Sequence, residues 1–235
     1  AHRSIGTWHR AVDVFVALTQ FQKAKLLAGG VPESRMIIRP NFLSSDPGPG
    51  PGDGGYALFA GRLTREKGVL TLLEAWARLP MPVPLRIVGS GPLVEEVRRA
   101  AATNRAVSYL GPQPHGRVLE LLQRAACLVF PSEWYESFGR IVLEALAVGT
   151  PVAAASGGAA EELVRDGSTG ALFRPGDPEG LAVAVSRIVQ NGEADGAMRT
   201  ACRREYLEKY TAERAYERLI EIYRMATGHR PDKTE

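Results

Sequence analysis

The chain has 235 residues, of which 45% are hydrophobic, 23% charged and 7% aromatic, which excludes disordered, collagen-like and low-complexity proteins. The net charge is +3, and residues 1–44 carry six Lys and Arg against two carboxylates, so the remainder is nearly balanced. Because no basic face with interleaved aromatic residues stands out, we expect no nucleic-acid partner.

Residues 11–44 have the pattern of a truncated α/β layer. An apolar run at 12–18, a helical stretch ending at Gly29-Gly30 and a short run at 36–38 predict strand, helix and strand. The first residues have the character of the middle of a folded domain, so we expect residues 1–44 to be the tail fragment of an N-terminal domain. Alternating Pro and Gly at 45–55 forbid a helix and predict an extended, solvated interdomain linker.

Residues 56–210 alternate short apolar runs with segments of helical period. Six strands are predicted, at 56–60, 85–88, 107–110, 128–130, 152–154 and 171–173. This alternation predicts a doubly wound parallel sheet, in which ligands bind beyond the carboxyl ends of the strands. Residues 211–235 contain apolar positions at helical spacing and predict an amphipathic helix followed by a tail.

The loop after the first strand carries two cations, Arg62 and Lys67, between Gly61 and Gly68. Together they are suited to hold a diphosphate, the guanidinium by paired hydrogen bonds and the ammonium as a point charge. Surface charge beside a helix start explains the same residues. The loop after the second strand, 89–94, lacks the third glycine of a dinucleotide fingerprint, although its turn allows a ligand to approach the backbone at Gly91.

The loop after the fourth strand leads into an apolar helix. Ser137 is predicted to cap a helix beginning near Phe138, whose first N–H groups favour an anion. Glu144 follows among apolar residues, either buried with a partner or on an exposed polar face. After the fifth strand, Gly157 and Gly158 permit close backbone approach, and Glu161 and its neighbour Glu162 are also explained as acidic residues of a helix first turn.

Metal and covalent chemistry have little support in the sequence. Asp177-Pro178-Glu179 is predicted to start a helix, and the four histidines form no metal-spaced pair. Cys127 and Cys202 are too few for a disulfide framework and favour a reducing, cytoplasmic location. The longest uncharged stretch, 145–160, is interrupted by glycine and proline, so no membrane-spanning helix or signal peptide is expected.

Taken together, these loops resemble the family-four retaining glycosyltransferases of the two-domain GT-B architecture. The resemblance covers residues 56 to about 225, and 18–41 are similar to the end of the family's N-terminal domain. The motifs occur in the family's order: Gly61-Arg62-Leu63 with Glu66-Lys67-Gly68, Gly89-Ser90-Gly91-Pro92-Leu93, Phe130-Pro131-Ser132, Glu136 and Glu144 separated by seven residues, Gly149-Thr150-Pro151-Val152, Gly157-Gly158 with Glu161, and Asp166-Gly167-Ser168-Thr169-Gly170. Trp134-Tyr135-Glu136 with Arg140 is similar to a bacterial polysaccharide-biosynthesis branch.

The resemblance implies roles for individual residues. Arg62 and Lys67 would hold the donor diphosphate and stabilise its growing charge, helped by backbone N–H groups of Phe138 and Gly139. Glu144 would accept hydrogen bonds from the ribose, and Glu136 would orient the donor sugar. The base pocket would lie near Gly91 and 110–114. Retention would follow attack from the leaving-group face, with no metal and no cofactor.

Two positions depart from the family pattern. Ala160 stands where many members have proline. Arg140 stands where many have an aliphatic residue, and it either contacts phosphate or acceptor or faces solvent.

The expected partners follow from the same resemblance. They are a nucleotide sugar, a saccharide or lipid-linked acceptor, and the N-terminal domain that this chain largely lacks. A peripheral membrane contact made by that domain is left as an open alternative. Because catalysis needs both walls of the cleft, we expect the isolated chain to bind nucleotide weakly and transfer nothing. The alternatives are another GT-B nucleotide-sugar enzyme, such as an epimerase, and a non-catalytic nucleotide-binding module.

Overall fold

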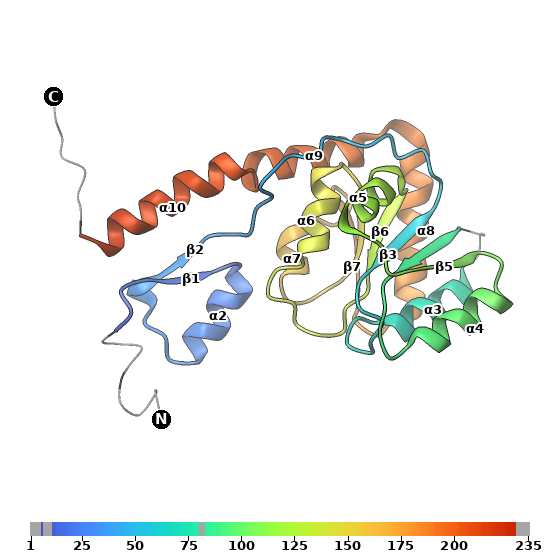
Figure 1. The fold of residues 1–235 in the computed structure, drawn as a ribbon, viewed down its shortest axis with the longest axis horizontal. Helices are drawn as coiled ribbons and strands as arrows, with labels where there is room; N and C mark the ends of the chain where they lie inside the picture. Colours follow the sequence, from blue (N-terminus) through green and yellow to red (C-terminus); the bar gives the residue numbers. More distant parts are fainter. Residues whose placement is uncertain (1–5, 7–10, 80–82, 229–235) are drawn as a thin grey trace.

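The computed structural model describes residue 6 and residues 11–79 and 83–228, and its larger part is built on a six-stranded parallel sheet (Figure 1). The strands are β3 (Ala57–Ala60), β4 (Leu85–Val88), β5 (Val107–Gly111), β6 (Cys127–Phe130), β7 (Val152–Ala155) and β8 (Gly170–Phe173). They lie in the order β5-β4-β3-β6-β7-β8, with every neighbouring pair parallel. The predicted doubly wound sheet is confirmed, and its strand order reverses between β3 and β6.

Helices cover both faces of this sheet. They are α3 (Val69–Arg78), α4 (Val94–Thr103), α5 (His115–Arg124), α6 (Arg140–Ala147), α7 (Ala160–Leu163), α8 (Pro178–Asp195), α9 (Ala197–Lys209) and α10 (Ala212–Ala226). Side chains of α5, α6, α7 and α9 share one buried cluster, and those of α3, α4 and α8 share another. Figure 1 shows α3 and α4 on the opposite side of the sheet from α5 and α6.

Strand β6 shows why the sheet is apolar on both sides. Leu128 and Phe130 belong to the cluster of α5 and α6, whereas Cys127 and Val129 belong to the cluster of α3 and α8. Successive side chains of a strand point to opposite faces, so a strand covered on both sides is apolar at every position. Both cysteines are buried free thiols, and burial raises the pKa of Cys127 to about 12.

The smaller part consists of β1 (Phe15–Ala17), α2 (Gln20–Ala28), a 3₁₀ turn η1 (Glu33–Arg35) and β2 (Met36–Ile38). The strands pair in parallel, Phe15 opposite Met36, which confirms the predicted strand, helix and strand. The first strand is shorter than the apolar run at 12–18 suggested. Thr19 caps α2 with its side chain and α2 contains no buried residue, as expected of a helix with few neighbours.

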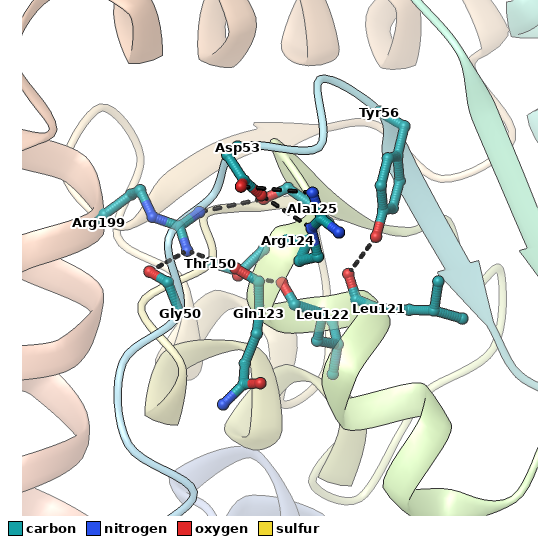
Figure 2. Close-up of polar contacts among 10 residues, drawn as sticks. All are labelled: Gly50, Asp53, Tyr56, Leu121, Leu122, Gln123, Arg124, Ala125, Thr150 and Arg199. Atoms are coloured by element: carbon teal, nitrogen blue, oxygen red, sulfur yellow. Dashed lines mark hydrogen bonds and ion pairs between the residues drawn. The ribbon is translucent and has the colours of Figure 1, made fainter.

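Residues 45–55 form neither helix nor strand and none of them is buried, as predicted for a solvated connection, but the segment is also hydrogen-bonded to the larger part. Their backbone N–H groups at Gly50, Gly52 and Gly54 donate to the carbonyl oxygens of Val148, Gln123 and Arg124. Arg199 of α9 donates to the carbonyl oxygens of Gly50, Gln123 and Ala125 at 3.0–3.2 Å (Figure 2). The segment is therefore fastened to the larger part along its length.

The amphipathic helix predicted after residue 210 is α10, which extends away from the sheet toward the side where β1 and β2 lie (Figure 1). Tyr216, Tyr223 and Met225 are exposed on it. Within the part of the chain that the structure describes, no helix is both long and apolar enough to cross a membrane.

Candidate functional site

A cavity of about 400 Å³ lies at the carboxyl ends of β3, β4 and β5, next to the point where the strand order reverses. It is lined by Ala60, Gly61, Arg62, Val88, Gly89, Ser90, Pro112, Gln113, His115, Val118, Ile141 and Glu144. The predicted residues Gly61, Arg62 and Glu144 meet here although they are far apart in the sequence. Ligands of doubly wound sheets bind at this position, so it is the candidate site.

Gly91 does not line this cavity. Its φ is +156°, and a Cβ there would lie too close to the backbone of Leu63. The two loops are joined by hydrogen bonds from Leu63 N to Ser90 O at 2.9 Å and from Leu93 N to Leu63 O at 3.0 Å. The sequence had suggested that a ligand approaches the backbone at Gly91. The structure shows instead that the glycine allows two backbone segments to pack together.

Glu144 is buried, only 4% exposed, which decides between the two alternatives for this residue. Its Oε1 lies 3.0 Å from Nε2 of His115 at the start of α5 and 3.3 Å from Nε of Arg140, one helical turn earlier on α6. Arg140 was expected to contact phosphate or acceptor or to face solvent. It is 70% exposed, but its Nε reaches Glu144.

His115 is the site residue that sequence reasoning missed. It lies 29 positions from Glu144, and local spacing gives no sign that the two side chains meet. The one available signal is its place directly after 110–114, where the base pocket was expected. Pro112 and Gln113 do line the cavity.

A second cavity, also of about 400 Å³, is lined by Arg62, Glu66, Lys67, Trp134 and Glu136. Lys67 Nζ forms an ion pair with Glu136 Oε1, which also accepts a hydrogen bond from Ser132 Oγ at 3.0 Å. A hydrogen bond from its own backbone amide holds the pKa of the exposed Glu66 carboxyl below its ordinary value. Arg62 lines both cavities, and the second expected diphosphate ligand, Lys67, lines the second cavity.

The start of α6 differs from the prediction. The helix begins at Arg140, and Gly139, with a φ of +84°, precedes it without a side-chain cap. Ser137 is therefore not the cap; its carbonyl oxygen accepts a hydrogen bond from Thr19 Oγ1 at 3.3 Å. Phe138 is buried against the ring of Tyr210, so its side chain belongs to the core. The chain enters α6 through a glycine in the left-handed conformation, which serine adopts far less readily.

The loop after β7 packs against the loop after β6. A Cβ at Gly158 would press on the backbone of Glu136, and Ala159 N donates to Glu136 O at 3.2 Å. Gly157, with a φ of +106°, lies beside the Tyr135 ring. These glycines support the segment that carries Glu136, and they line neither cavity.

Of the two acidic residues that follow, Glu161 is exposed and lines neither cavity, whereas Glu162 has a defined contact. The Glu162 carboxylate accepts hydrogen bonds from the backbone N–H groups of Gln20 at 2.8 Å and Phe21 at 2.6 Å. These groups open α2, so Glu162 connects the smaller part of the molecule to the larger.

The structure gives no metal-ligand cluster among the residues it describes: no three His, Cys, Asp or Glu side chains there are grouped to hold a metal ion. Asp177 caps α8 with Pro178 in its first turn, which confirms the predicted helix start. His2, His9 and His229 lie outside the described residues.

The fold is the Rossmann-like α/β fold of GT-B glycosyltransferase structures. Anabaena HepE in complex with UDP and glucose superimposes with a TM-score of 0.80 at 20% identity, covering 90% of this chain and 63% of that one. A sucrose-phosphate synthase of Thermosynechococcus elongatus gives 0.79 at 24% identity, covering 92% and 58%. At these identities the likeness concerns the fold.

The family follows from the sequence. Residues 45–205 match the model of the glycosyl transferases of group 1. A D-inositol 3-phosphate glycosyltransferase of Corynebacterium urealyticum is 33% identical over 71% of this chain and 42% of its own length, and a Mycobacterium tuberculosis glycogen synthase is 37% identical over 65% and 37%. The chain belongs to the group 1 glycosyl transferases, and it spans less than half the length of these relatives.

Proposed function

We propose that this chain is the donor-binding half of a retaining, metal-independent hexosyltransferase that moves a sugar from a nucleotide-sugar donor to a saccharide or lipid-linked acceptor. The observation that carries the proposal is the position of Arg62 between two cavities. One contains the buried carboxylate of Glu144, and the other contains Lys67 and Glu136. A nucleotide in the first places its diphosphate near Arg62 and its sugar in the second.

The chemistry rests on fixed charges. As the bond between sugar and diphosphate breaks, negative charge grows on the phosphate oxygens, and Arg62 and Lys67 stabilise it. The ion pair with Glu136 holds Lys67 in place before the donor arrives, so little reorganisation is needed at the reaction. In the proposal these two cations supply the charge stabilisation that a divalent metal supplies in metal-dependent enzymes.

The acceptor side of the reaction lies outside this chain in our proposal. Residues 11–44 supply one edge of a second α/β layer, and the rest of that layer would bind the acceptor and close the cleft. The isolated chain then binds donor but transfers nothing, because the acceptor is not positioned and water is not excluded. A cytoplasmic location fits the buried, free thiols.

Calorimetric titration of this chain with UDP, GDP and ADP, with and without Mg²⁺, tests the donor site. We expect one diphosphate to bind without the metal, and Lys67→Ala to weaken it about 10- to 100-fold, the usual effect of losing a charged hydrogen bond. Arg98→Ala, an exposed residue of α4 that lines neither cavity, is the matched control and should bind normally. Equal binding by the Lys67 variant would refute the diphosphate assignment.

A chain extended by the complete preceding domain then tests the reaction itself. Transfer to a saccharide or lipid-linked acceptor with retained anomeric configuration is the expected result. Isomerisation or hydrolysis of the donor without any need for acceptor would instead indicate an epimerase-like enzyme. Tight binding without turnover would indicate a nucleotide-binding module.

A further inference from the structure

Two basic side chains approach one oxygen of the buried Glu144 carboxylate, one by a hydrogen bond and one as an ion pair. Nε2 of His115 is 3.0 Å from Oε1, and Nε of Arg140 is 3.3 Å from the same atom. The Glu144 side chain is 5% exposed, while those of His115 and Arg140 are 61% and 70% exposed. The two basic side chains therefore reach inward from the surface to a carboxylate that α6 holds in the core.

The surroundings of Glu144 explain why such partners are needed. Its neighbours on α6, Val142, Leu143, Ala145 and Leu146, are completely buried. A carboxylate in apolar surroundings without hydrogen bonds is costly. Because an ionised carboxylate only accepts, His115 donates from Nε2, as the Nε2–H tautomer or as imidazolium.

The distribution of contacts leaves one oxygen available. A carboxylate offers about four acceptor positions, and both the His115 hydrogen bond and the Arg140 ion pair are made at Oε1. Glu144 and His115 line the same cavity, as do Gln113 and Ile141. We propose that His115 is a positioning residue: with help from Arg140, it holds Oε1 so that Oε2 accepts a hydrogen bond from a ribose hydroxyl of the bound nucleotide. This inference rests on the proposed donor site.

The geometry indicates that His115 contributes more than Arg140 to the positioning of the Glu144 carboxylate. The His115 distance is that of a good hydrogen bond, whereas 3.3 Å from Arg140 is longer than the usual charge-assisted bond. Arg140 is also attached to the same helix one turn away, so it cannot fix α6 relative to α5. Among the described residues, His115 is the partner that ties the carboxylate to a second element of the site.

The test compares ribonucleotides with their deoxy counterparts. UDP, GDP and ADP are titrated first, and the one that binds is compared with its 2′-deoxy and 3′-deoxy forms in wild type, His115→Ala and His115→Gln. We expect His115→Ala to weaken the ribonucleotide about tenfold but the relevant deoxynucleotide by less than about twofold, because the hydroxyl and His115 act through one carboxylate. The conservative His115→Gln, whose Nε2 amide also donates, should restore most of the affinity.

Arg117→Ala is the matched control, since Arg117 lies on the same helix, pairs with Glu120 and does not line the cavity. It should bind both nucleotide forms like wild type. If His115→Ala weakens ribo and deoxy forms equally, or weakens neither, the positioning role is wrong while the donor site stands. If no diphosphate binds wild type at all, the donor site and this inference both fail.

Discussion

At the scale of single residues, Gly89 shows how a backbone requirement shapes the candidate site. Its φ is +139°, and a Cβ would overlap the carbonyl oxygen of Gly61. Gly61 in turn precedes Arg62, and both line the cavity with Gly89. The sequence predicted a tight turn in this loop, but it did not show that a side chain at Gly89 would clash with the Gly61 carbonyl group in the loop after β3. Its small size lets the loops after β3 and β4 lie side by side.

Gly89→Ala is therefore expected to destabilise the protein by about 1–3 kcal/mol or more, the usual range for a residue forced into sparsely populated backbone geometry. Urea unfolding of the chain measures the change. Gly116→Ala is the comparison, because Gly116 lies in α5 with open space around it and alanine favours helices. Equal stability of the Gly89 variant and wild type would show that the loops are not as closely packed as described.

At the scale of elements, the contact between α2 and the larger part could not be predicted. Glu162 was explained as an acidic residue in the first turn of α7, an interaction within its own helix. It accepts instead from the first amides of α2, about 140 residues away in the sequence. The Phe21 and Tyr135 rings, 5.1 Å apart, and Thr19 on Ser137 O add to this contact. The smaller part thus packs against the loop that carries Glu136.

Removing this contact should loosen α2. In Glu162→Ala, the N–H groups of Gln20 and Phe21 lose their acceptor, a change worth about 0.5–2 kcal/mol for a helix cap. We expect faster tryptic cleavage at Lys23 and Lys25, the basic residues of α2, with cleavage elsewhere unchanged. Glu161→Ala, its exposed neighbour, is the control. The same cleavage rate in both variants would contradict a role for Glu162 in docking α2.

At the scale of the whole molecule, the segment 45–55 sets how the two parts are connected. The composition correctly excluded helix and strand there, but composition does not reveal a docking partner. Arg199 supplies it: burial lowers the pKa of its guanidinium, and its donors are directed at three carbonyl oxygens (Figure 2). At one end of the segment, Asp53 pairs with Arg124, whose carbonyl oxygen accepts a hydrogen bond from Gly54 N. At the other end, Asp46 pairs with Arg203, so both ends of the connection are held.

Arg199→Ala should lower the free energy of unfolding by about 1.5–3 kcal/mol, because charged hydrogen bonds to three carbonyl groups are lost together. Urea unfolding measures it, and amide exchange at Gly50, Gly52 and Gly54 should quicken in the same variant. Arg204→Ala is matched to it, being an exposed arginine on the same helix. Unchanged exchange at the glycines would mean that the linker is held without Arg199.

The six alternating strands, the helix-free connection, the amphipathic α10 and the family could all be predicted from the sequence, because they depend on local periodicity, turn chemistry and ordered motifs. It also placed Arg62, Lys67, Glu136 and Glu144 after the right strands, and the structure brings them to two adjoining cavities.

Which side chains meet could not be predicted and depends on how the elements pack. His115 on Glu144, Glu162 on α2 and Arg199 on the linker join segments 29 to about 150 residues apart. Their partners depend on strand order and helix docking, which no window of the sequence contains. The helix start at Arg140 was likewise set by the left-handed Gly139, where local capping rules had favoured Ser137. Local rules fix elements, and packing between elements fixes the site.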